Sequence, residues 1–166
     1  LDVASLTQHG IGPAVATLGT ATTPAHIRQL TRLTGSVIFC FDGDRAGKAA
    51  AWKAMETVLP QAGDKVELKF LLLPDGEDPD SLLRSRGTAF FLELIDQALP
   101  LSDFLLGELA SRIDLSSADG RSRLAALTRP LFNRLPTGIY RELLLAQLAE
   151  RVGLSKERLE ALLEEE

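Results

Sequence analysis

Two short acidic stretches of the sequence carry side chains that are suited to binding a divalent metal ion. Asp42 and Asp44 flank a glycine, and Asp78 and Asp80 flank a proline. Carboxylates held this close repel one another, at a cost of about 1 kcal/mol for each close pair in bulk water and more near protein. A bound cation removes that cost. Carboxylate oxygens are hard ligands that suit Mg²⁺ or Mn²⁺, ions that bridge to substrate phosphates. The residue types therefore indicate a metal site that acts on phosphates.

Helix capping is a second explanation for three of these acids. Asp44 precedes a stretch with helical spacing and Asp78 precedes a proline, so each could accept hydrogen bonds from the amides of a first helical turn. Asp80 would then be a first-turn acid that the helix dipole favours. Asp42 has no such role, because it ends the apolar stretch 37–41, where an unpaired buried charge would be expensive. The combination favours a metal site, with which the capping roles are compatible.

Strand-like and helix-like stretches alternate before these acids. Residues 14–18, 36–41 and 66–72 predict strands, whereas 24–33 and 45–59 have helical spacing. This alternation predicts a parallel sheet with helices on its faces. Ligands in such sheets bind beyond the carboxyl ends of the strands, so we expect both acidic stretches at one edge of the sheet.

From residue 74 onward the pattern is helical. The predicted helices, separated by prolines, glycines or polar loops, are 79–85, 88–98, 102–113, 118–135, 138–152 and 156–164. The chain is thus expected to have an α/β part, residues 1–96, and a helical part, residues 97–166.

The composition limits the classes of protein that fit. The 166 residues are 45% hydrophobic, as in ordinary globular proteins, and the formal net charge is −5. That charge argues against nucleic-acid binding through bulk positive charge, so any such contact must be local. The single Cys40 excludes an internal disulfide, and no zinc site is encoded. Cys40 and Trp52 are both expected to be core residues. The chain shows neither a membrane span nor a signal peptide, which predicts a cytoplasmic protein.

Three stretches of the chain resemble bacterial DnaG-type replicative primases. They are residues 16–21, 41–47 and 73–80, in the order and spacing of the family, and the likeness continues through residues 100–102 and the helical tail. The resemblance implies an α/β TOPRIM-type, partly parallel sheet with flanking helices, followed by the all-α helical subdomain of the primase polymerase core. It also implies that several parts of a primase lie outside this chain: a catalytic glutamate just before Asp2, a zinc-binding domain, a basic N-terminal subdomain and a helicase-binding domain.

The resemblance also implies roles for individual residues. By position, it assigns the metal ions to four carboxylates: Asp42, Asp44, Asp78 and Asp80. The first three are expected to be catalytic, and Asp2 is a supporting acid. Gly19 and Thr20 would shape the loop at the end of the first predicted strand. Arg45 and Lys48 are candidates for phosphate contact, although a solvated helix face explains both equally well.

The activity implied is synthesis of short RNA primers on a single-stranded DNA template for DNA replication. Mg²⁺ or Mn²⁺ would bind the triphosphate of an incoming ribonucleotide and help activate the primer 3′-hydroxyl. The replicative helicase is the expected partner of the full-length protein, through a domain absent here, and this chain is expected to be inactive alone. The alternatives are a TOPRIM module of a topoisomerase, a phage primase-helicase or a nuclease, and a non-catalytic DNA-binding scaffold.

Overall fold

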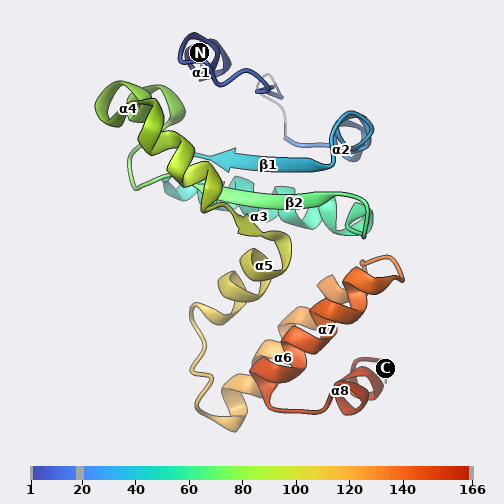
Figure 1. Ribbon diagram of the computed structural model, residues 1–166. Helices are drawn as coiled ribbons and strands as arrows, with labels where there is room; N and C mark the ends of the chain where they lie inside the picture. Colours follow the sequence, from blue (N-terminus) through green and yellow to red (C-terminus); the bar gives the residue numbers. More distant parts are fainter. Residues whose placement is uncertain (1, 18–20, 165–166) are drawn as a thin grey trace.

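A small mixed sheet with helices on both faces forms the first part of the chain, and helices form the second (Figure 1). The computed structural model describes residues 2–17 and 21–164. Strands β1 (Ser36–Phe41) and β2 (Glu67–Leu72) are parallel, with Phe39 opposite Phe70. The short strand β3 (Leu99–Pro100) adds to β2 in the antiparallel direction. The sheet order is therefore β1-β2-β3, and the prediction of a partly parallel sheet is confirmed.

Helix α3 (Arg45–Val58) makes the crossover between the two parallel strands and is followed by a short 3₁₀ helix, Leu59–Gln61. Helix α1 (Asp2–Gln8) opens the described chain, and α2 (Pro24–Thr31) precedes β1. Helix α4 (Pro79–Asp96) is interrupted at Gly87, whose φ of 80° is not helical. That break agrees with the two separate helices predicted over residues 79–98.

The first predicted strand is wrong over residues 14–17, which form no regular structure. An apolar stretch becomes a strand only where a neighbouring strand completes its hydrogen bonds, and β1 pairs with β2 alone among the described strands. Val15 is accordingly 73% exposed. Leu18, Gly19 and Thr20 lie outside the described residues.

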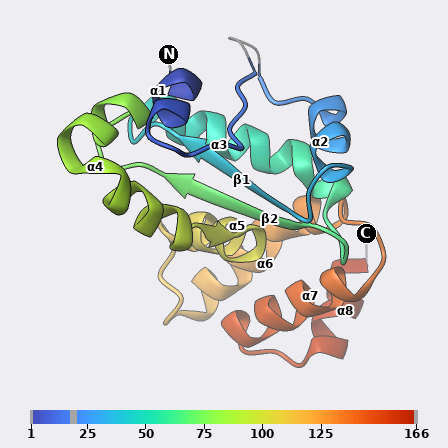
Figure 2. The ribbon, with the colours of Figure 1, turned by 45° about the horizontal axis from the view of Figure 1, so that its top comes forward.

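Apolar side chains cover both faces of the sheet. On one face, Phe39 and Phe70 pack with α3 and with Phe104 of α5 (Leu101–Ala110). On the other, Leu71 packs with α4, against which α1 also lies (Figure 2). Cys40, expected in the core, is exposed. In β1 it lies on the same face as Ile38, opposite to the face of Phe39 that α3 covers.

After α5, the helical part of the described chain continues with three helices, α6 (Ala118–Phe132), α7 (Ile139–Val152) and α8 (Lys156–Glu164). The predicted helices are confirmed, with α5 and α6 ending three residues earlier than expected. Helix α5 lies between the sheet and α6 (Figure 1). Its Phe104 stacks on Phe70 with 4.7 Å between ring centroids, so the two parts share one core. The boundary between an α/β part and a helical part at residues 96/97 stays a prediction. In the described part of the chain, no helix has the length and hydropathy to cross a membrane.

Candidate active site

The turn after β1 is held against the turn after β2 by backbone contacts that require glycine. A Cβ atom on Gly43 would lie 1.9 Å from the carbonyl oxygen of Pro74, across the two turns. Within the turn after β1, a Cβ atom on Gly47 would lie 2.1 Å from the carbonyl oxygen of Asp42. Both distances are far inside van der Waals contact. The amide of Gly43 also donates to the carbonyl of Glu77 at 3.2 Å. The two acidic stretches are therefore brought together at one edge of the sheet, as the strand order predicted.

Two of the predicted site acids cap helices. An oxygen (Oδ1) of Asp44 accepts a hydrogen bond of 2.6 Å from the amide of Gly47, at the start of α3. Oδ1 of Asp78 accepts one of 2.7 Å from the amide of Ser81, whose hydroxyl in turn accepts from the amide of Asp78. The capping interpretation is thus confirmed for both residues. Each of these caps engages Oδ1, which leaves the second oxygen of the carboxylate to face other groups.

Asp42 is exposed and makes no helix cap. Local loss of water contact raises the pKa of its carboxyl above the usual range, and the negative charges of Asp2, Asp78 and Asp44 raise it further. These three charges come from α1, from the turn after β2 and from the turn after β1. The structure therefore brings together four of the predicted acids, which are Asp42 and its three neighbours.

The raised pKa of Asp42 gives a prediction for stability. A folded state that holds a proton more tightly than the unfolded state is disfavoured once that proton is lost, and the cost fades as pH falls through the raised pKa. Asp42→Asn should therefore increase the free energy of unfolding of the metal-free protein at neutral pH. The gain should vanish below about pH 3, where aspartates are protonated in both states. Urea unfolding in the presence of EDTA at the two pH values measures it.

Asp114 provides a control of opposite sign. Hydrogen bonds from Ser116 lower the pKa of its carboxyl, so Asp114→Asn should reduce the free energy of unfolding at neutral pH. A decrease caused by Asp42→Asn at neutral pH would contradict the crowding of negative charge around this residue.

The negative charge of Asp80, the remaining predicted acid, is already balanced by an ion pair. Oδ2 of Asp80 lies 2.8 Å from Nη2 of Arg84, and the side chain of Asp80 is 15% exposed. The described residues contain no preformed group of three or more His, Cys, Asp or Glu side chains that could hold a metal ion. The acids therefore neighbour one another without converging on a single point.

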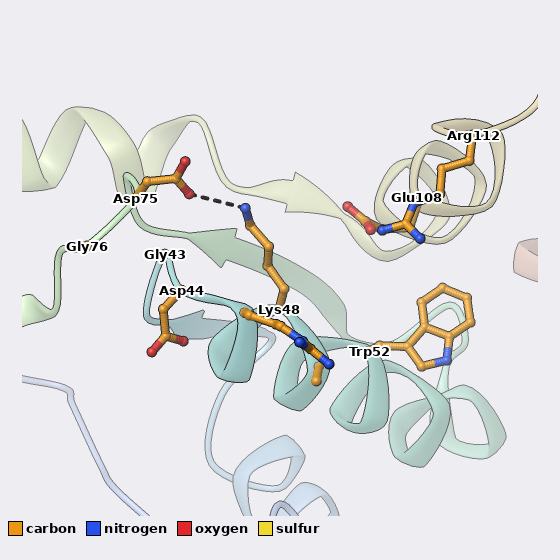
Figure 3. Close-up of a pocket in the computed structure, with 10 residues that line it drawn as sticks. Gly43, Asp44, Lys48, Trp52, Asp75, Gly76, Glu108 and Arg112 are labelled. Atoms are coloured by element: carbon orange, nitrogen blue, oxygen red, sulfur yellow. Dashed lines mark hydrogen bonds and ion pairs between the residues drawn. The ribbon is translucent and has the colours of Figure 1, made fainter.

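Arg45 and Lys48 line a pocket of about 460 Å³ beside the acidic turn (Figure 3). Gly43 and Asp44 also border it, and Lys48 is paired with Asp75 at 3.1 Å. The opposite wall consists of Glu108, on α5, and Arg112, in the turn that follows α5 (Figure 3). No pattern in the sequence pointed to these two residues, because they lie some sixty positions after Lys48 and outside every motif.

The fold and the acidic edge define a Toprim-like domain. Residues 1–83, half of the chain, match the family model described as Toprim-like. Residues 102–157 match a second model, described as the DnaB-helicase binding domain of primase. This second match corrects the expectation that the helicase-binding region lies outside the chain, since part of it falls on α5 to α8.

Similarity to known proteins extends over nearly the whole chain. The DNA primase of Escherichia coli strain K12 is 49% identical over 154 residues, which are 93% of this chain and 26% of that protein. The crystal structure of a DNA primase domain from Pseudomonas aeruginosa has a TM-score of 0.92 and 45% identity, and the match covers 99% of this chain and 51% of that one. A DnaG primase catalytic domain bound to single-stranded DNA has a TM-score of 0.87 and 47% identity, covering 95% and 50% of the two chains.

The chain belongs to the bacterial DnaG-type DNA primases, as the resemblance of its motifs predicted. It spans about a quarter of the length of the curated relatives that it matches.

Proposed function

We propose that this chain supplies the metal-binding part of a primase that makes short RNA primers on single-stranded DNA by nucleotidyl transfer. The observation that carries the proposal is the gathering of Asp42, Asp44, Asp78 and Asp2 at the carboxyl edge of the parallel strands. Their mutual repulsion is the cost that a divalent cation would remove. The relatives, which are DNA primases, support the same function.

The donor set fits Mg²⁺ or Mn²⁺, because it consists of carboxylate oxygens from three backbone segments. Asp42, Asp44 and Asp78 would hold the ions, with Asp2 and Asp80 as supporting acids. Asp80 forms an ion pair with Arg84. The ions supply charge neutralisation on the triphosphate of the incoming ribonucleotide. The protein holds the carboxylates in place: two are anchored as helix caps, and the glycine contacts fix the third.

We propose three partners for the whole protein. They are a single-stranded DNA template, ribonucleoside triphosphates and the replicative helicase. The relative that is bound to single-stranded DNA supports the first. The match of residues 102–157 to a helicase-binding model supports a contact between the helicase and the helices α5 to α8.

Calorimetric titration of the full-length protein with Mn²⁺ tests the metal site. We expect a binding site that the double substitution Asp42→Asn, Asp44→Asn removes. Asparagine is as good an N-cap as aspartate, so α3 should keep its start while the charges are lost. Binding in the unsubstituted protein should also weaken as pH falls through the raised pKa of Asp42, because protons compete with the metal.

The control for this titration is Asp75→Asn. Asp75 is an exposed acid near the same edge whose partner is Lys48, and it is not among the proposed ligands. Binding of Mn²⁺ that is equally tight in the double variant and in the unsubstituted protein would refute the assignment of these carboxylates.

A further inference from the structure

The pocket between α3 and α5 has features of a second binding site, distinct from the acidic cluster. One wall is a single face of α3 that carries Arg45, Lys48 and Trp52. The other consists of Glu108, on α5, and Arg112, in the turn after α5 (Figure 3). Of the proposed metal ligands, Asp44 alone lines it. The pocket therefore begins at the acidic turn and leads away from it along α3.

Trp52 provides an aromatic surface inside this pocket. It is the single tryptophan of the sequence, and it is only partly buried. One side of the residue packs against the main core, in agreement with the core role predicted for it, while the side chain also lines the pocket. An indole in this position can accept a nucleic-acid base by stacking, which tolerates any base because every base has a π-face.

Two guanidinium groups in the pocket are available for phosphate. Arg45 and Arg112 are both exposed, and neither takes part in the ion pairs found among the described residues. Lys48, by contrast, is engaged by Asp75. Guanidinium groups bind phosphate oxygens through two parallel hydrogen bonds. Local cations of this kind are the type of contact that a chain with a net charge of −5 must use.

The pocket groups on α3 are spread along the length of this helix and are not clustered around one point. Arg45 and Trp52 are seven residues apart on α3, which places them on one face about 10 Å apart along the axis. We propose that the pocket binds single-stranded nucleic acid as it passes the acidic turn, with a phosphate on Arg45 and Arg112 and a base stacked on Trp52. The inference rests on the proposed function for the source of that strand, but binding here requires no metal.

Photochemical crosslinking tests the pocket directly. The probe is a short single-stranded oligonucleotide with 5-bromouracil at every position, as DNA in one arm and as RNA in the other, irradiated with the full-length protein in EDTA. We expect a crosslink that mass spectrometry maps to Trp52, with either probe or with both. Arg112→Gln should reduce its yield about tenfold, as expected for loss of one charge-assisted hydrogen-bonded contact. Glu108→Gln should increase it, because a negative charge beside the phosphate is removed.

The controls separate this site from other contacts. Arg123→Gln, on an exposed position of α6, should leave the yield unchanged. Trp52→Phe keeps an aromatic ring and should retain anisotropy-measured binding better than Trp52→Ala. Crosslinks that map only outside the pocket, or a yield that Arg112→Gln does not change, would overturn the proposal. Complete loss of the crosslink on adding equimolar ribonucleoside triphosphate would also overturn it, in favour of a site for the free nucleotide. Loss of Mn²⁺ binding in the Asp42 and Asp44 variants bears on the metal site alone, so the two proposals can fail separately.

Discussion

Replacement of Asp42 by asparagine should abolish primer synthesis by the full-length protein while its fold is retained. Asparagine has almost the same shape, and Asp42 is exposed, caps no helix and carries a charge that its acidic neighbours disfavour. The substitution thus removes a proposed metal ligand without removing a structural contact. Loss of a group that merely orients a ligand costs 10- to 100-fold, so loss of the ligand itself should exceed about 100-fold. A primer-synthesis assay with single-stranded template, ribonucleotides and Mg²⁺ measures the effect.

The matched control is Asp75→Asn in the same assay. Asp75 lies in the neighbouring turn, is more exposed and pairs with Lys48, so its loss should leave synthesis within a few-fold of the unsubstituted protein. Unfolding of both variants, followed in urea, shows whether any loss of synthesis reflects the fold. Near-normal synthesis by Asp42→Asn would refute the central assignment of the site.

The positions of these acids in the fold could be predicted from the sequence because each stands where an element begins or ends. Asp42 follows an apolar stretch, and Asp44 and Asp78 precede helical ones, so strand order alone places them at one edge. The helix-capping role of Asp44 and Asp78 could also be predicted, since it depends on hydrogen bonds to amides three residues later in the chain. Interactions this local are encoded in a short window of sequence.

Other features depend on contacts between distant segments, and the sequence did not reveal them. Residues 14–17 are apolar enough for a strand, but no described strand pairs with them. Cys40 lies in an apolar strand and is nevertheless exposed, because burial depends on which parts of the fold pack over each position of the strand. The wall of the pocket formed by Arg112 requires the packing of α5 against the sheet, through Phe104 and Phe70. The spacing of apolar residues along α5 predicts a helix but does not predict which part of the fold that helix packs against.

Gly43 in the acidic turn illustrates the same limit. The sequence shows Gly43 between two acids, where a simple turn would explain it. The structure shows instead that its missing side chain allows backbone contact, because a Cβ atom there would lie 1.9 Å from the oxygen of Pro74 and 2.5 Å from that of Leu73. These backbone atoms, which directly follow β2, cannot move aside as the tip of a long side chain can. A methyl group at Gly43 must therefore push the turn after β1 away from the turn after β2.

Gly43→Ala should accordingly lower the free energy of unfolding by about 3 kcal/mol, at the upper end of the cost of overpacking. It should also separate Asp42 from Asp78 and weaken Mn²⁺ binding, although no ligand is changed.

Gly107→Ala is the matched control. Gly107 lies within α5, where an added Cβ meets no atom within 4 Å, so this substitution should instead stabilise by about 0.5–1 kcal/mol, the difference between alanine and glycine in a helix. Urea unfolding of both variants gives the two values. If Gly43→Ala unfolds at the same urea concentration as the unsubstituted protein, the two turns are not in the contact described, and the acids of the site are not held together by it.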